Sequence, residues 1–131
     1  MVKIVIGVDR SARASRALSE GATLAMALGA EVHLVTAFSD NARGPVTVTD
    51  ERKLAERDLE QIASRSGLRS AVLHALPAKP DKAIVQVAAE QGADMIVIGN
   101  VGAQGTRRVL GSIASAVVAH APCSVLVVKT S

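Results

Sequence analysis

The most constraining feature of this chain is a glycine-rich segment between two short apolar segments near its carboxyl end. The first segment is Met95–Ile98 and the second is Ser124–Val128, and residues 99–111 between them contain four glycines. This order predicts a strand, a glycine-rich loop, a helix and a strand. Backbone N–H groups of such a loop can converge on an anion, and a helix N-terminus adds about half a positive charge. The segment therefore predicts a binding site for a phosphate group.

Strand-like and helical segments alternate along the whole chain. Short apolar runs rich in β-branched residues alternate with segments whose apolar residues recur at helical spacing. This alternation predicts an α/β fold with an open, five-stranded parallel sheet and helices on both faces. The expected strands are Val2–Val8, Glu31–Ala37, Leu68–Leu76, Asp94–Ile98 and Ser124–Val128, and the expected helices are Ala12–Leu28, Glu51–Ser64, Pro80–Gly92 and Gly111–His120.

The strand order decides where a ligand would bind. Ligands of such sheets lie beyond the carboxyl ends of the strands, at the point where the strand order reverses. In the order 3-2-1-4-5 that point lies between the first and fourth strands. Asp9, directly after the first strand, would then face Gly99–Gly102 across it, although the two are far apart in the sequence.

The composition predicts one globular domain over residues 1–131 and argues against nucleic acid as a partner. Apolar residues make up 49% of the chain, with one Phe and no Trp or Tyr. Modules that bind single-stranded nucleic acid stack bases on aromatic rings, which this chain nearly lacks. The net charge is only +3, and the arginines are spread along the chain rather than clustered.

The single cysteine and the lengths of the apolar runs predict the cellular compartment of the protein. One cysteine, Cys123, excludes an intrachain disulfide and fits a reducing environment. No apolar run approaches the roughly 18 residues that span a bilayer, and the first run is too short for a signal peptide. We therefore expect a cytoplasmic protein with no membrane partner.

Four segments spread over essentially the whole chain form a further pattern: Ile4–Ser11, Ala93–Asn100, Leu110–Ser112 and His120–Val128. With its Gly-Ser pair and its Ala-Pro-Cys sequence, this pattern resembles the small single-domain members of the universal stress protein family. The resemblance implies a Rossmann-like fold, akin to adenine nucleotide alpha hydrolases, with the order 3-2-1-4-5. It also implies a homodimer through the last strand, Val125–Val128, and a site for ATP, accompanied by Mg²⁺, or for a related adenine nucleotide.

The glycine loop departs from the family pattern by one residue. Members that bind ATP carry Gly-x2-Gly-x9-Gly-(Ser/Thr). Gly99 and Gly102 fit its first two positions, but only eight residues separate Gly102 from Gly111 and Ser112. One residue spans up to about 3.5 Å, so the deletion matters if it tightens the part of the loop that touches phosphate.

The resemblance also implies the residues of the nucleotide site. Asp9 matches a position near the ribose or adenine, the end of the second strand matches the adenine wall, and the glycines match positions at the ribose and phosphates. Backbone N–H groups at the start of the last helix would meet a phosphate. The cofactor-binding set is Asp9, Arg10, Ser11, Val35, Thr36, Ala37, Gly99, Asn100, Gly102, Gly111, Ser112, Ile113 and Ala114.

Structural interpretations of the same residues stay open. Asp9 can cap the first helix, the end of the second strand can be plain core, the glycines can form a tight turn, and Ser112 can be an ordinary N-cap. Arg107 and Arg108 could neutralise phosphate or simply lie in a solvated loop.

No catalytic residue and no metal ligand is predicted. The histidines at positions 33, 74 and 120 lie singly in different elements, which argues against a metal site. Cys123 begins a buried strand and is expected to be a core residue rather than a nucleophile.

Three functions fit the sequence to different degrees. The first is a dimeric stress-response regulator that binds ATP. The second is a family member that binds AMP, cyclic AMP or no nucleotide and acts as a protein-interaction module. The third, an ATP-hydrolysing enzyme, is the least favoured, because the loop lacks the Gly-Lys-(Ser/Thr) end of P-loop NTPases and no general base is evident, although weak ATPase activity stays open.

Overall fold

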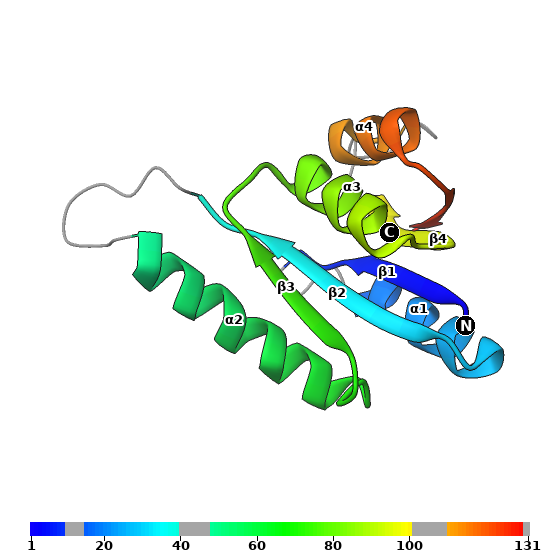
Figure 1. Cartoon of the computed structure of the whole chain (residues 1–131), viewed down its shortest axis with the longest axis horizontal. Coiled ribbons are helices and arrows are strands. Elements are labelled where there is room, and N and C mark those ends of the chain that lie inside the picture. The colour runs from blue at the N-terminus through cyan, green and yellow to red at the C-terminus, as the bar shows by residue number, and fades with distance from the viewer. Residues whose placement is uncertain (10–14, 40–47, 101–109, 130–131) are drawn as a thin grey trace.

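The fold is a five-stranded parallel sheet between two layers of helices (Figure 1). The computed structural model describes residues 1–9, 15–39, 48–100 and 110–129. The strand order is β3-β2-β1-β4-β5, which confirms the predicted fold class and order. The strands are β1 (Lys3–Gly7), β2 (Glu31–Ala37), β3 (Val72–Leu76), β4 (Met95–Asn100) and β5 (Ser124–Lys129), and the helices are α1 (Ser15–Leu28), α2 (Val48–Arg65), α3 (Pro80–Gln91) and α4 (Ser112–His120).

The three central strands are buried on both faces, as their continuous apolar runs predict. In β1, alternate residues belong to different cores: Ile4 and Ile6 pack with α1 and α2, whereas Val5 packs with α3 and α4. All three side chains are fully buried. One layer of helices therefore covers each face, and the sheet has two separate aliphatic cores.

Strand β3 begins at Val72, so the predicted start at Leu68 is wrong. The backbone N–H of Leu68 donates to the carbonyl of Ala63 at 2.9 Å, and Gly67 before it has a φ of +71°. These are features of a glycine-terminated helix end, in which the next apolar residue folds back on the last turn. Leu68 is buried by this helix end rather than by sheet pairing.

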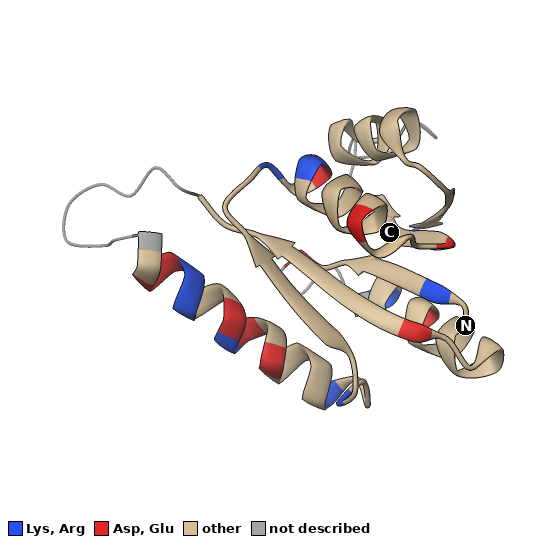
Figure 2. Cartoon of the chain, in the orientation of Figure 1, with Lys and Arg blue, Asp and Glu red and all other residues tan. Residues whose placement is uncertain are grey.

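Helix α2 begins at Val48, earlier than the predicted Glu51, and it carries much of the molecule's charge. Acidic and basic residues follow one another along it in Figure 2, while Ala55 and Leu59 are fully buried against the sheet. Its outward face is therefore a solvated surface. None of the helices that the structure describes is both long and apolar enough to cross a membrane.

Candidate functional site

A cavity of about 560 Å³ opens at the carboxyl ends of the strands, where the order reverses between β1 and β4. It lies on the face of the sheet that α3 and α4 cover, because Val35, Ile84, Ile98 and Ala114 all belong to that core. The lining residues are Gly7, Val8, Asp9, Val35, Thr36, Ala37, Pro80, Ile84, Ile98, Gly99, Gly111, Ser112, Ile113 and Ala114.

Most of the predicted site residues meet at this cavity. Nine of them line it, drawn from the ends of β1, β2 and β4 and from the start of α4: Asp9, Val35, Thr36, Ala37, Gly99, Gly111, Ser112, Ile113 and Ala114. Asn100 does not line the cavity but bonds to a residue that does. The predicted residues Arg10, Ser11 and Gly102 lie outside the described part of the chain, as do Arg107 and Arg108.

The end of β2 forms one rigid wall of the cavity. Val35 and Thr36 are almost completely buried, and the carbonyl of Val35 accepts the N–H of Val8 at 2.8 Å. Just beyond the wall, the N–H of Phe38 donates to the carbonyl of Leu76 at 2.9 Å. The wall is therefore held by β1 on one side and by β3 on the other.

Gly7 gives the cavity a close-packed apolar floor. A Cβ atom added to Gly7 would lie 2.6 Å from Cδ1 of Ile84 and 3.1 Å from Cγ2 of Ile98, closer than carbon atoms approach without a shift. Both isoleucines line the cavity. The missing side chain at Gly7 thus lets Ile84 and Ile98 close over the end of β1.

The start of α4 turns backbone N–H groups toward the cavity. Gly111 is the N-cap residue and, as a glycine, it has no side chain to cap the N–H groups that follow it. The first helical residues Ser112, Ile113 and Ala114 line the cavity. The first turn of a helix has N–H groups without helical partners, and it attracts anions.

Asn100 holds this helix start in place. Its side-chain Oδ1 accepts the backbone N–H of Gly111 at 2.8 Å, joining the end of β4 to the N-cap of α4. The N–H of Gly111 is therefore already bonded within the chain, whereas the residues that follow it line the cavity. Asn100 is a positioning residue rather than a lining residue.

Asp9 is the one ionisable side chain among the described residues that line the cavity. The remaining described lining is apolar or backbone, apart from the hydroxyls of Thr36 and Ser112. The cavity combines an aliphatic interior with a helix N-terminus, an arrangement that suits a ring system carrying a phosphate.

Five lining residues were missed by the sequence interpretation: Gly7, Val8, Pro80, Ile84 and Ile98. Gly7 and Val8 are the two residues before Asp9, and Ile98 directly precedes Gly99, so adjacency could have indicated them. Pro80 and Ile84 come from the start of α3, and only the right-handed crossover that lays α3 beside β1 brings them to the site.

The three histidines lie in different elements, as predicted, but His33 of β2 and His74 of β3 meet across neighbouring strands. His33 Nδ1 and His74 Nε2 are 2.9 Å apart, and His33 Nε2 is 2.7 Å from a carboxylate oxygen of Glu31. Both nitrogens of His33 and Nε2 of His74 are therefore already engaged in hydrogen bonds within the chain. In the described residues, no group of three or more His, Cys, Asp or Glu side chains is arranged to hold a metal ion.

Cys123 is half-buried against the core under α3 and α4. Burial, and secondarily the charge of Asp94, raise the pKa of its thiol above the ordinary value.

These features define a doubly wound α/β protein with a cavity at the switch point of its sheet. A sequence model of the universal stress protein family matches residues 1–129, and the chain belongs to this family. A putative universal stress protein from Staphylococcus haemolyticus is 31% identical over 139 residues, which cover 97% of this chain and 84% of that protein.

Two solved structures with the same fold contain nucleotides. A universal stress protein in complex with cyclic AMP superposes with a TM-score of 0.78 at 28% identity, covering 99% of this chain and 98% of that one. The universal stress protein from Archaeoglobus fulgidus in complex with dAMP superposes with a TM-score of 0.68, also at 28% identity, covering 98% of each chain.

Proposed function

We propose that this protein binds an adenine nucleotide in the cavity between β1 and β4. One observation carries the proposal: an aliphatic cavity at the switch point ends at the N-terminus of α4, whose N-cap residue is a glycine. The similar structures that hold cyclic AMP and dAMP support the choice of adenine.

The lining suggests how each part of the ligand would be held. The adenine ring would lie against the wall formed by Val35 to Ala37 and above Ile84, where burial of an apolar surface stabilises it. Asp9 can accept hydrogen bonds from ribose hydroxyls at the end of β1. A phosphate would take the N–H groups of Ser112 to Ala114 and the positive end of the helix dipole.

ATP is the first candidate within this proposal. The start of α4 provides for one phosphate, and Gly99 together with Gly102, which lies outside the described residues, would provide for the others. No described side-chain cluster is suited to a metal, so Mg²⁺ would rely on phosphate oxygens for most of its ligands.

AMP or cyclic AMP is the second candidate, and two specific observations favour it. The loop is one residue shorter than the ATP-binding pattern, and the two similar structures contain monophosphates. In either case we propose binding without turnover, because Asp9 is the one described ionisable side chain at the cavity.

We also propose that the protein acts as a nucleotide-dependent dimeric regulator in the cytoplasmic stress response. Strand β5 ends the sheet, and Leu126 on it is 37% exposed. Neighbouring α4 exposes Ile113 and Val118. An apolar sheet edge is a template for pairing with a second chain, and a homodimer would cover it.

The nucleotide is tested by mass spectrometry of the protein as purified, followed by calorimetric titration with ATP, AMP, cyclic AMP and adenosine. The key variant is Ser112→Asp, with Ser112→Ala as its control. A carboxylate in the first turn favours the helix but repels a phosphate. We expect Ser112→Asp to lower the affinity for nucleotides at least about tenfold and to leave adenosine binding unchanged.

Each other result has a definite meaning. Equal weakening for adenosine would show that the substitution disturbs the ring pocket instead of the phosphate. Unchanged nucleotide affinity would show that the phosphate does not bind at the start of α4 and would overturn the proposed orientation. No binding of any of the four compounds would leave the interaction-module function in its place.

The dimer is tested with Leu126→Lys. The Leu126 side chain is exposed, so a lysine at this position is not forced into the core. Sedimentation velocity should show a shift from dimer to monomer, with Met26→Lys on the exposed surface of α1 as the control. A dimer that persists in Leu126→Lys would exclude β5 as the interface.

A further inference from the structure

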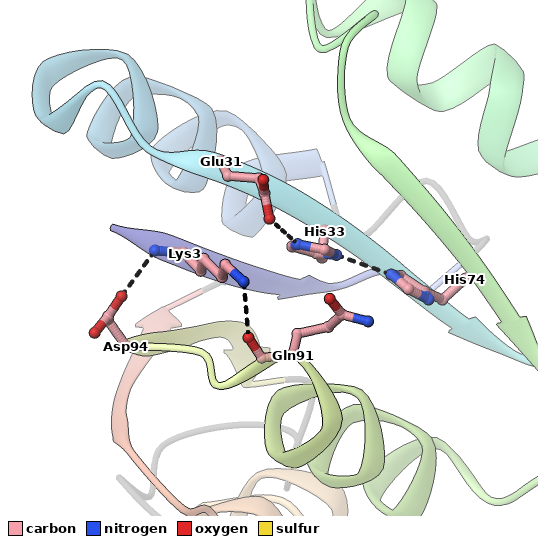
Figure 3. A network of polar contacts seen from close by, with 6 residues as sticks. All are labelled: Lys3, Glu31, His33, His74, Gln91 and Asp94. Carbon is pink, nitrogen blue, oxygen red and sulfur yellow. Dashed lines mark hydrogen bonds and ion pairs between the residues drawn. The ribbon is translucent and has the colours of Figure 1, made fainter. Parts of the chain in front are cut away.

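A chain of three side chains crosses from β2 to the edge strand β3 (Figure 3). His33 lies in the middle and is only 2% exposed. One of its ring nitrogens faces Glu31 on its own strand, and the other faces His74 on β3. The ring centres of the two histidines are 5.2 Å apart and their planes differ by 27°. These values fit rings joined edge to edge through their nitrogens, rather than rings stacked face to face.

The contacts determine where the protons lie when both histidines are neutral. The carboxylate of Glu31 is an acceptor, so His33 carries its proton on Nε2 and donates it to Glu31. His33 Nδ1 is then an acceptor, and His74 Nε2–H donates to it. One proton occupies each bond, so the chain is satisfied without any further proton.

A second charge on the two rings cannot be accommodated in this arrangement. If both histidines are protonated, the two facing nitrogens both carry hydrogen atoms, and neither can accept. Two positive rings at this distance also repel each other. The His33–His74 bond must then break, while the Glu31–His33 ion pair can persist.

Charged groups of both signs surround the chain. Lys3 of β1 and the N-terminal amine lie near Glu31, and Glu90 of α3 lies near His74. Asp94 and the carbonyl of Gln91 are bound to Lys3. From α2, Arg52, Glu56 and Glu60 line the surface groove that also contains His74.

We propose that Glu31, His33 and His74 form a proton-sensitive clamp that holds β3 on β2 at neutral pH and releases it in acid. The location suits this role, because β3 is an edge strand paired with β2 alone, and none of its residues is fully buried. A side-chain bond between the two strands therefore adds to the backbone pairing with β2 and the packing under α2 that hold β3 in place. The inference does not depend on the proposed nucleotide.

The direction of the effect follows from the two titrating groups. Burial, and secondarily His33, lower the pKa of His74 below 6.5, although Glu90 opposes this. The hydrogen bond from His33 lowers the pKa of Glu31, with the charges of Lys3 and the N-terminus adding to it. For both groups the unfolded chain binds protons more readily than the folded one, so their stabilisation is present at higher pH and is lost as the pH falls through the folded pKa values.

The test is amide hydrogen exchange of β3 in the intact protein between about pH 8 and about pH 5, with β5 as the internal reference. Protection factors correct for the intrinsic pH dependence of exchange. We expect protection over Val72–Leu76 to fall with acidification by up to about tenfold per pH unit, the limit for linkage to one proton, and protection in β5 to fall less.

Two variants separate the clamp from general acid sensitivity. His74→Gln retains an N–H donor for His33 but does not titrate, so the extra pH dependence of β3 should disappear. His120→Gln removes a histidine whose bond in the described structure, to the Ala116 carbonyl, lies within α4, and it should behave as the wild type. Equal pH dependence in β3 and β5, or undiminished dependence in His74→Gln, would overturn the proposal.

A measurement on the wild type covers the case in which His74→Gln does not fold. Nitrogen-15 spectra of the three histidines give the protonation state of each ring as a function of pH. Loss of β3 protection should coincide with uptake of the second proton by the His33–His74 pair. Loss of protection in a different pH range from that uptake would equally overturn the clamp.

Discussion

The polar groups at the two ends of the sheet are arranged in opposite ways. At the amino ends of the strands the groups bind one another: the N–H of Lys3 donates to Asp94 at 2.8 Å, and its ammonium group donates to the Gln91 carbonyl at 3.2 Å. At the carboxyl ends, helix α4 directs its first N–H groups to a cavity with an aliphatic floor. Because a parallel sheet collects all its carboxyl ends on one side, one end can be closed for stability while the other stays available to a ligand.

The substitution with the largest expected effect on the ligand-binding end is Gly7→Ala, which adds a methyl group at the floor of the cavity. The new methyl would push Ile84 and Ile98, which line the cavity, so we expect the nucleotide affinity to fall about tenfold, together with a loss of roughly 1–3 kcal/mol in the free energy of unfolding. Calorimetric titration and urea denaturation measure the two effects.

Gly21→Ala is the matched control for Gly7→Ala. Its Cβ would lie 2.7 Å from Cδ1 of Ile6, a similar clash in the core under α1 on the opposite face of the sheet. The higher helix propensity of alanine offsets about 1 kcal/mol of the cost of this clash. Affinity should be unchanged in Gly21→Ala, and an equal loss in both variants would mean that the cavity responds to general overpacking.

A smaller effect is expected at the junction of β4 and α4. Asn100→Ala removes the acceptor for the Gly111 N–H, which should lower the free energy of unfolding by about 1 kcal/mol and weaken nucleotide binding several-fold, because the helix start is no longer held. Asn100→Asp retains an acceptor and should retain the stability. If Asn100→Ala binds as tightly as the wild type, the bond does not position the site.

The smallest effect should come from the closed end. Asp94→Ala removes the acceptor of the Lys3 N–H and should cost about 1 kcal/mol of unfolding free energy without changing ligand affinity. Asp94→Asn, which keeps a side-chain oxygen, is the control. An altered affinity in Asp94→Ala would show that the two ends of the sheet are coupled.

The sheet was predictable because local patterns and topology agree. The apolar runs of β1, β2 and β4 mark strands buried on both faces, and the family resemblance supplies their order. Most of the cavity follows from that order, since Asp9, Ala37 and Gly99 all lie at or just beyond strand ends. The start of β3 was not predictable from hydrophobicity, because Leu68 is as apolar as a strand residue but closes a helix.

Contacts that depend on strand register could not be predicted from the sequence. The order places β2 beside β3, but only the observed register, in which Val35 pairs with His74, brings His33 within a hydrogen bond of His74. A slip of one residue would send the His74 ring to the other face. Likewise, the close approach of Ile84 to Gly7 depends on how far α3 slides along the sheet, which no local pattern encodes.

The bond between Asn100 and Gly111 has a consequence for how this family can vary. It fixes the separation of the two points that bracket residues 101–109, so the start of α4 keeps its place whatever the length between them. Closing a slightly longer loop costs little, since doubling a loop adds only about 0.6 kcal/mol. A chain built this way can gain or lose a residue there while the scaffold under it stays the same.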